Sequence, residues 1–397
     1  MDLSTLLSRF NEPETLKMAK LGRELRAQGA DITDLSLGEP DFDTPEHIKE
    51  AAKKAIDENY SHYTPVAGYL ELREAVCTKL KRDNGLGYTP DQIVVSTGAK
   101  QSIANTVLAI VDKGDEVIIP TPYWVTYSEI VKLAGGSVKL VNTAFENGYK
   151  ISPAELEESL NDNIRLFMFS SPCNPTGAFY SKEELKALAD VFARYPKVYI
   201  MSDEIYEHIN FIGKHESIAQ FDFIKDRVIV INGLSKGWAM TGWRLGYIAA
   251  PLHIAKACDK IQGQFTSGAN AIAQRAAIAA LTGTMQPTTD MVAEFKKRRK
   301  RVMELLADIP GIICNEPPAA FYVFPRVDFF FNKTAPDGSI IKNADDLCMY
   351  LLHVSHVSLV TGKAFGEPRC IRLSFANSMA NIEKGIGKMR RALEQLT

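Results

Sequence analysis

A lysine and an arginine share a stretch of the chain that offers neither of them an acidic partner. Residues 233–247 read GLSKGWAMTGWRLGY, with Lys236 and Arg244 among glycines, tryptophans and other apolar residues. Confinement in an apolar site lowers the pKa of a lysine, so its neutral amine can serve as nucleophile or base. An arginine stays charged and can hold a phosphate or carboxylate through two hydrogen bonds. Exposure of both cations to solvent, the alternative, explains their shared apolar setting poorly.

Three other stretches place polar groups directly after apolar, strand-like runs. In VVSTGAKQSI, the small residues 97–99 let backbone N–H groups at a helix start approach an anion. Asn174 in FSSPCNPTG can donate a hydrogen bond from an irregular loop. Asp203 in VYIMSDEIYEH follows a buried run and needs a cationic partner, and Tyr206 comes three residues later. Each stretch alone also fits an ordinary alternative, namely a glycine-capped turn, simple turn chemistry, or an acid that caps a helix.

Ligands of open α/β sheets bind beyond the carboxyl ends of the strands, so these four stretches are expected to meet. Together they offer a buried amine, a carboxylate for a cation, a phenol, an amide and an anion cradle. Pyridoxal phosphate requires this set, because it has an aldehyde, a pyridine nitrogen, a ring oxygen and a phosphate. The residues therefore predict a pyridoxal-phosphate site.

The elements that must position these groups alternate between helix and strand. Apolar strands separated by helices indicate a mostly parallel sheet covered by helices on both faces, an α/β fold. The strands of this sheet are expected at 93–97, 116–120, 137–141, 165–172, 197–204, 227–233 and 246–250. Helices are expected at 46–58, 69–83, 100–111, 123–134, 181–194, 253–263, 269–282, 287–307, 343–354 and 380–395.

The pattern changes near residue 285 and divides the chain. A long charged helix, strand candidates at 319–327 and 370–376, and a final helix indicate a smaller α+β domain. We expect an N-terminal segment, 1–45, packed with that small domain, a large cofactor-binding domain, 46–285, and the small domain itself, 286–397. Residues 330–343 are expected to form a surface loop.

Composition excludes several classes of protein. The 397 residues are 46% hydrophobic and 24% charged with a formal net charge of −2, so nothing indicates nucleic acid or a membrane as partner. The basic run KKRRKR at 296–301 is interpreted as a solvated helix face. Six scattered cysteines fit neither a zinc site nor a disulfide framework. The first residues lack the apolar core of a signal peptide, and no run reaches the ~18 apolar residues of a membrane span. A cytoplasmic enzyme is expected.

Several motifs, in their order and spacing, resemble the fold-type I pyridoxal-phosphate aminotransferases, and most closely the bacterial aspartate aminotransferase subgroup. They are LGEPDFDTP, HYTPVAGYLELREA, TPYW, SSPCNPTGA, SDEIYEH, LSKGWAMTGWRLGY and IRLSFA, and they extend from residue 37 to residue 376. The resemblance implies a large and a small domain and a homodimer with shared active sites. It also implies amino acid and 2-oxo acid substrates.

The resemblance assigns cofactor roles to individual residues. Lys236 is expected to bind the cofactor aldehyde and to act as the catalytic base, with Asp203 facing the pyridine nitrogen. Tyr206 and Asn174 are expected to hydrogen-bond the ring oxygen, and Trp124 to stack on the ring. The phosphate is expected to be held by the backbone amides of Ala99 and Lys100, by Ser235 and Arg244, and by Tyr63 of the partner subunit.

The resemblance also assigns substrate contacts. Arg372 is the expected clamp of the α-carboxylate, helped by Asn174 and the backbone of Gly38, with Trp124 beside it. A dicarboxylate is favoured because Lys100 matches the lysine that binds the distal carboxylate in this subgroup, with Thr15 near the position of a helping hydroxyl. Two departures are Cys173, where asparagine is common, and Arg275, which has no explanation from the sequence.

The expected reaction is amino transfer from L-aspartate to 2-oxoglutarate. Prephenate, aromatic or alanine substrates stay open, as do a β-lyase or a cyclopropane-forming synthase on the same residues. A regulator without catalysis is disfavoured because Lys236, Asp203 and Arg372 are all present. A nucleotide-binding dehydrogenase is disfavoured because the strand-end turns hold no GxGxxG.

Overall fold

The centre of the molecule is a seven-stranded sheet with one strand reversed. The computed structural model describes residues 3–12 and 14–397, together with the side chains of these residues except 14–17 and 19. The strand order is β2-β8-β7-β6-β5-β3-β4. Only β8 runs antiparallel to its neighbours, β2 and β7, so the predicted mostly parallel sheet is confirmed. The strands are β2 (Ile93–Ser96), β3 (Glu116–Thr121), β4 (Ser137–Asn142), β5 (Ile164–Ser170), β6 (Tyr199–Asp203), β7 (Val228–Gly233) and β8 (Gly246–Ala249).

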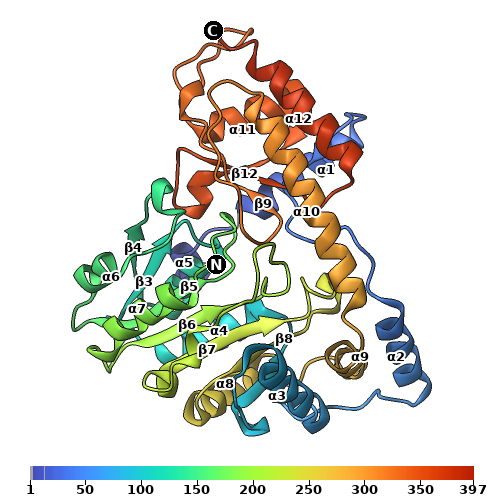
Figure 1. Ribbon diagram of the computed structural model, residues 1–397, viewed down its shortest axis with the longest axis vertical. Coiled ribbons are helices and arrows are strands. Elements are labelled where there is room, and N and C mark those ends of the chain that lie inside the picture. Colours follow the sequence, from blue (N-terminus) through green and yellow to red (C-terminus); the bar gives the residue numbers. More distant parts are fainter. Residues whose placement is uncertain (1–2, 13) are drawn as a thin grey trace.

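Helices cover both faces of this sheet, as the apolar strands require (Figure 1). Alternate residues of β7 point to opposite faces: Val228 and Val230 belong to one core cluster, and Ile229 and Ile231 to another. The first cluster contains residues of α2 (Glu46–Asp57), α3 (Leu70–Asn84), α6 (Pro153–Ser159), α7 (Lys182–Ala193) and α9 (Ala271–Thr282). The second contains residues of α4 (Ala99–Ile110), α5 (Thr126–Ala134) and α8 (Leu252–Phe265).

A further hydrophobic core lies in the upper lobe of Figure 1. The long helix α10 (Gln286–Ala307) rises from the large lobe to reach it, and α11 (Ala344–Ser355) and α12 (Met379–Leu393) pack there. The strands of this lobe are β11 (Val360–Thr361), β12 (Ile371–Ser374) and β9 (Tyr322–Val323) in one sheet, and β1 (Thr33–Asp34) and β10 (Val357–Ser358) in another.

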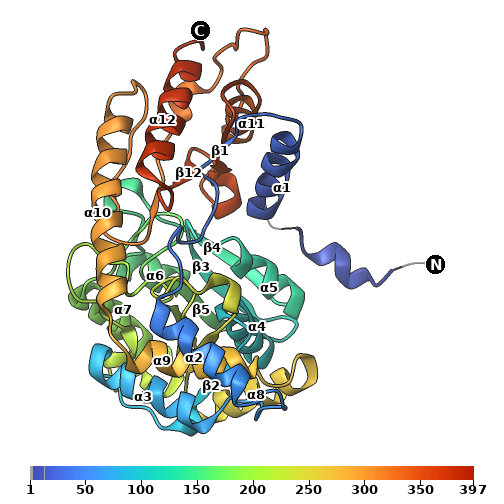
Figure 2. The same cartoon turned by 90° about the vertical axis from the view of Figure 1, so that its right-hand side faces the viewer.

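The N-terminal region belongs spatially to this upper lobe. Strand β1 pairs with β10, and Met18 of α1 (Glu14–Ala27) lies in the same core. Figure 2 shows α1 beside α11. Before α1, the backbone amide of Asn11 donates to Glu129 of α5 at 2.6 Å. These contacts favour the predicted division at residues 45 and 285, which stays a prediction.

The differences from the expected elements have local causes. Helix α6 was not expected, although Ser152 and Glu155 form the reciprocal capping box that marks its start. The strand expected at 319–327 is reduced to β9, because Ala319 and Arg326 form isolated bridges with other segments. Helix α5 begins at residue 126 rather than 123. The segment 330–343, predicted as a surface loop, has no α-helix, but Phe330 ends a 3-10 helix (Asp328–Phe330), and Phe330, Ala335 and Ile341 are buried.

The interpretation of the basic run in α10 as a solvated face is wrong for Arg298. This side chain is buried, donates to Asp41 at 2.6 Å, and lies over the ring of Phe42 at 5.0 Å. The helical period turns position 298 toward the core while Lys296 and Lys297 stay exposed. Arg298 thus ties α10 to the segment that leads into α2.

Two features are absent from the described residues. No helix in that part of the chain is long and apolar enough to cross a membrane. No group of three or more His, Cys, Asp or Glu side chains there is placed to hold a metal ion.

Candidate active site

The polar residues that end β2, β5, β6 and β7 surround one cavity of about 430 Å³. These strands run in the same direction, so their carboxyl ends meet at one edge of the sheet. The upper lobe closes the cavity from the other side with residues of β9, β12 and the segment after β1. Eleven of the site residues predicted from the sequence line this cavity: Gly38, Ala99, Lys100, Trp124, Asn174, Asp203, Tyr206, Ser235, Lys236, Arg244 and Arg372.

Lys236 follows β7 and directs its amine across the cavity. Its Nζ donates to the backbone carbonyl oxygen of Gly38. Burial, the largest cause, lowers the pKa of Lys236 to about 8, with Arg372 and Arg244 adding to the effect and Glu39 opposing it. Roughly a tenth of the amine is therefore neutral at pH 7, far more than for an ordinary lysine, and the neutral amine is the form that a nucleophile or base requires.

Asp203, the last residue of β6, is a buried carboxylate without a cationic partner among the described residues. It accepts hydrogen bonds from Tyr127 Oη at 2.6 Å and from the Ile205 amide at 3.2 Å. Burial raises the pKa of Asp203 to about 6, although both hydrogen bonds favour the charged form. A ligand that brings a cationic nitrogen to this carboxylate would relieve that desolvation.

Arg372 on β12 is 2% exposed and forms no ion pair with any described residue. One terminal nitrogen donates to Asn174 Oδ1 at 3.0 Å, and the other to the Ser36 carbonyl oxygen at 2.6 Å. The guanidinium carbon lies 4.6 Å from the ring centre of Tyr322 and 5.0 Å from that of Phe365. The two rings restrict its rotation, so a fixed, buried cation faces the cavity.

Tyr206 connects the two lobes at the cavity. Its hydroxyl lies 2.9 Å from the hydroxyl of Tyr322 on β9. The Tyr322 hydroxyl also approaches Gly38, where an added Cβ would lie only 2.8 Å from it. Tyr206, Tyr322 and Gly38 are thus packed into contact at the junction of the lobes.

A second cation, Arg244, lies at the start of α4. Arg244 adopts a φ of 56° and donates to the Thr241 carbonyl oxygen at 2.8 Å. Close approach of the backbone is essential here: a Cβ on Gly98 would lie 2.4 Å from Arg244, and one on Gly246 would lie 2.2 Å from the Ala99 nitrogen. A helix N-terminus beside a guanidinium is an anion cradle.

Lys100 adds a third cationic group beside this cradle. Its Nζ lies 5.0 Å from the centre of the Trp124 ring, and burial followed by the nearby Arg244 lowers the pKa of Lys100. The cavity lining carries four cationic side chains, Lys100, Lys236, Arg244 and Arg372, and two carboxylates, Glu39 and Asp203. This excess of positive charge suits a ligand with several anionic groups.

One predicted site residue is not brought into the cavity, and the side chain of another lies outside the described residues. The side chain of Tyr63 is 98% exposed and does not line it. Thr15 lies in α1, and its side chain is outside the described residues. The roles expected for both stay predictions.

Sequence reasoning missed several lining residues, notably Tyr127, Tyr322, Glu39, Ser36 and Thr241. Tyr127 had a signal, because it follows the predicted Trp124 by only three residues, and their rings make an edge contact at 5.6 Å. Thr241 lies between Lys236 and Arg244, and Ser36 and Glu39 flank Gly38, so their nearness to predicted residues was a signal. Tyr322 had no such signal, because only the packing of the two lobes brings it to the cavity.

Similarity to known proteins extends over nearly the whole chain. The model of the family described as aminotransferase class I and II matches residues 30–389. An aspartate aminotransferase of Bacillus subtilis is 41% identical, with 100% of both chains covered. A probable aspartate/prephenate aminotransferase of Rhizobium leguminosarum is 43% identical, with 98% of both covered.

Solved structures agree with this similarity. The aspartate aminotransferase of Rhizobium meliloti matches with a TM-score of 0.97 at 38% identity, covering 100% of both chains. That of Thermus thermophilus, solved with maleate, matches with a TM-score of 0.92 at 37% identity, covering 99% of this chain and 100% of the other.

Proposed function

Because this chain belongs to the class I and II aminotransferases, whose cofactor is pyridoxal phosphate, we propose that it transfers the amino group of L-aspartate to 2-oxoglutarate. The products are oxaloacetate and glutamate. One observation carries the proposal: Arg372 and Lys100 both line the cavity, and neither cation forms an ion pair with a described residue. Two separate cations suit the two carboxylates of aspartate.

The residues around the cavity fit the cofactor. The cradle made by Arg244 and the start of α4, which a Cβ at Gly98 would fill, suits its phosphate. Asp203, a buried carboxylate whose hydrogen bonds come from neutral donors, suits the ring nitrogen. We assign the remaining contacts as the sequence predicts: Tyr206 and Asn174 to the ring oxygen, Trp124 to the ring face, and Ala99, Lys100 and Ser235 to the phosphate.

When bound, the cofactor accepts the electron pair that is released as the Cα–H bond of the amino acid breaks. The protein moves the proton. Lys236 Nζ, partly neutral because its pKa is about 8, accepts the proton from Cα and would later donate it to C4′, the carbon that carried the cofactor aldehyde. Asp203 keeps a negative charge at the far end of the cavity, where it stabilises a protonated ring nitrogen.

Arg372 holds the α-carboxylate and so turns the single Cα–H bond of the amino acid toward Lys236. Its two terminal nitrogens are directed by Asn174 and Ser36, and the rings of Tyr322 and Phe365 limit its motion. A planar carboxylate can accept two parallel hydrogen bonds from such a guanidinium. The geometry thereby orients the Cα–H bond instead of merely binding the substrate.

Lys100 is assigned to the distal carboxylate. Its amine lies over Trp124 and forms no ion pair with a described residue, so it is available to an anionic side chain of the substrate. The Thermus relative was solved with maleate, a four-carbon dicarboxylate, which supports a dicarboxylate substrate for this cavity. The name of the Rhizobium relative adds prephenate, itself a dicarboxylate, as a second candidate substrate.

We also propose that the active unit is a homodimer. Tyr63 is 98% exposed, and Phe265 and Leu70 are 68% and 50% exposed. Large exposed apolar side chains favour association, and a second subunit would cover Tyr63 and bring it to a phosphate. Six cysteines without a disulfide suit a reducing compartment such as the cytoplasm.

The decisive experiment is a substrate panel with purified protein loaded with cofactor. Oxaloacetate and glutamate should form from L-aspartate and 2-oxoglutarate, and the Lys236→Ala variant should form neither. Prephenate, aromatic, alanine and β-elimination substrates serve as comparison arms. Turnover of any of these with none of aspartate would refute the proposed substrate while leaving the family unchanged. Mixing Lys236→Ala with Tyr63→Ala subunits tests the shared site, because only mixed dimers would regain activity.

A further inference from the structure

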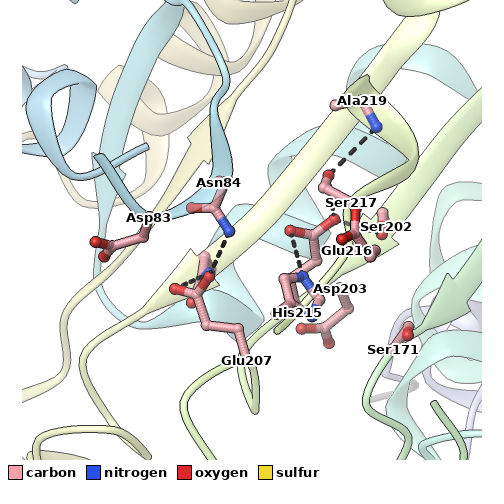
Figure 3. A network of polar contacts seen from close by, with 12 residues as sticks. Asp83, Asn84, Ser171, Ser202, Asp203, Glu207, His215, Glu216, Ser217 and Ala219 are labelled. Carbon is pink, nitrogen blue, oxygen red and sulfur yellow. Dashed lines mark hydrogen bonds and ion pairs between the residues drawn. The ribbon is translucent and has the colours of Figure 1, made fainter. Parts of the chain in front are cut away.

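A buried ionic cluster lies on the side of the Lys236 turn that faces away from the cavity. Lys79 of α3 is 0% exposed and pairs with Glu207, which is 5% exposed. Asn84 bridges the pair by accepting from Lys79 at 2.8 Å and donating to the other Glu207 oxygen at 2.9 Å. Figure 3 shows Glu207 and Asn84 facing each other. None of these three side chains lines the cavity.

The cluster is linked to the turn that carries Lys236. Asn232, near the end of β7, donates from Nδ2 to Glu207 at 3.0 Å. The same side chain accepts from the Gly233 amide at 2.7 Å. Gly233 precedes Lys236 by three residues, so Glu207 fixes the point at which the chain leaves the sheet.

A second link reaches the other side of Lys236. The ring of His208, adjacent to Glu207, makes an edge contact with Trp238 at 4.7 Å. A Cβ on Gly237 would lie 2.8 Å from His208, and the Gly237 carbonyl oxygen accepts from Thr288 at 2.7 Å. The backbone is thus held both before and after Lys236.

Glu207 also directly follows Tyr206, which is assigned to the cofactor ring. Burial alone would raise the pKa of Glu207, but Lys79 and then His208 outweigh it and hold the pKa well below its usual range. The carboxylate is therefore charged wherever the protein is folded near neutral pH, and it accepts from Asn232 throughout.

We propose that Glu207 is a positioning residue, which aims Lys236 by holding the backbone turn through Asn232 and His208. The proposal rests on the proposed role of Lys236. An ion pair that served stability alone could be replaced by apolar side chains of similar size without effect on Lys236. A positioning role requires instead that the hydrogen bond to Asn232 be kept.

Two double variants separate these roles. Both Lys79→Met/Glu207→Gln and Lys79→Met/Glu207→Met remove the two charges and keep side chains of similar length. Only the first retains an acceptor for Asn232. The readouts are the thermal unfolding midpoint, the pH midpoint of the visible absorbance of the bound cofactor, and the separate values of kcat and KM.

The glutamine variant should keep the wild-type pH midpoint. In the methionine variant, the pH midpoint should move by at least about half a unit. Its kcat should fall roughly 10- to 100-fold, the loss expected when a reacting group is misplaced, while KM for the amino donor changes little. Asn232→Ala, which leaves the ion pair in place, should reproduce the shift.

Glu204 supplies a matched control. It is 1% exposed and accepts from Ser202 at 2.9 Å and Ser217 at 2.6 Å, contacts that do not involve the Lys236 turn. The Glu204 charge also raises the pKa of the adjacent Asp203, so its removal leaves Asp203 charged, and Glu204→Gln should lower the unfolding midpoint while kcat stays near the wild-type value.

A folded methionine variant with wild-type pH midpoint and kcat would overturn the proposal. If that variant fails to fold, a wild-type pH midpoint in Asn232→Ala overturns it instead. Failure of the proposed substrate is a separate result, because the absorbance midpoint is measured without substrate. Absence of cofactor attachment at Lys236 in the wild type would refute the assigned role of the lysine itself.

Discussion

Asp203 should destabilise the cofactor-free protein, and Asp203→Asn should reveal by how much. The carboxylate is 4% exposed, and burial raises its pKa from the ordinary 3.8 to about 6. Between these two pH values the folded chain binds more protons than the unfolded chain, so the free energy of unfolding falls as pH rises. Each pKa unit corresponds to about 1.4 kcal/mol, so the full effect of Asp203 is about 3 kcal/mol above pH 7.

The measurement is denaturant unfolding of both cofactor-free proteins across a range of pH. At pH 4.5 the ionisation of Asp203 already lowers the free energy of unfolding by about 1 kcal/mol. The excess stability of Asp203→Asn over the wild type should therefore grow by about 2 kcal/mol between pH 4.5 and 7.5. Asparagine keeps the size of the side chain but can accept from only one of Tyr127 and the Ile205 amide. The lost hydrogen bond lowers stability by an amount that does not depend on pH, so the growth of the advantage with pH is the quantity to compare. The same substitution should abolish most transaminase activity, because the negative charge beside the cofactor ring is lost.

Asp203→Asn removes the destabilising carboxylate, whereas Tyr127→Phe should make the same carboxylate more destabilising. Its hydroxyl donates to Asp203 at 2.6 Å, and a hydrogen bond to a charged group contributes about 1.5–3 kcal/mol. Its removal should raise the pKa of Asp203 further and extend the pH-dependent loss of stability above pH 6. A stability difference between Asp203→Asn and wild type that does not vary with pH would refute the argument, as would one that shrinks as pH rises.

Three further substitutions test the cavity. Arg372→Leu should lower kcat/KM for every amino donor by roughly 30- to 4,000-fold, equivalent to about 2–5 kcal/mol for unpairing a buried charge. The control is Arg369→Gln, which changes a half-exposed side chain. Equal effects of the two substitutions would contradict the role assigned to Arg372. Lys100→Met should lower kcat/KM roughly 10- to 100-fold for aspartate and much less for alanine, so a uniform loss would argue against a distal-carboxylate role. Gly98→Ala should weaken cofactor binding in a spectroscopic titration, because the new Cβ would lie 2.4 Å from Arg244; Gly87→Ala, with open space around it, should not.

The local pattern of the sequence was sufficient for the large sheet and for the strand-end residues. Strands such as β7 are apolar on both faces because helices cover both, and that leaves a continuous signal in the sequence. The signal was weaker in the upper lobe, where β1, β9, β10 and β11 each have two residues. Strands this short carry no periodicity, so only their tertiary partners define them.

The sequence was therefore enough to identify the residues that carry the chemistry, while the fold determines their pKa values and their contacts. Lys236, Asp203 and Arg244 could be identified from their places after apolar runs, because parallel strands end at a common edge. The pKa of Asp203 depends on Tyr127 and on complete burial, which no local pattern reports. The confinement of Arg372 between Tyr322 and Phe365, and the support of the Lys236 turn by Lys79 and Glu207, join residues far apart in the chain. Desolvation and hydrogen bonding depend on three-dimensional neighbours, so only the tertiary structure could decide them.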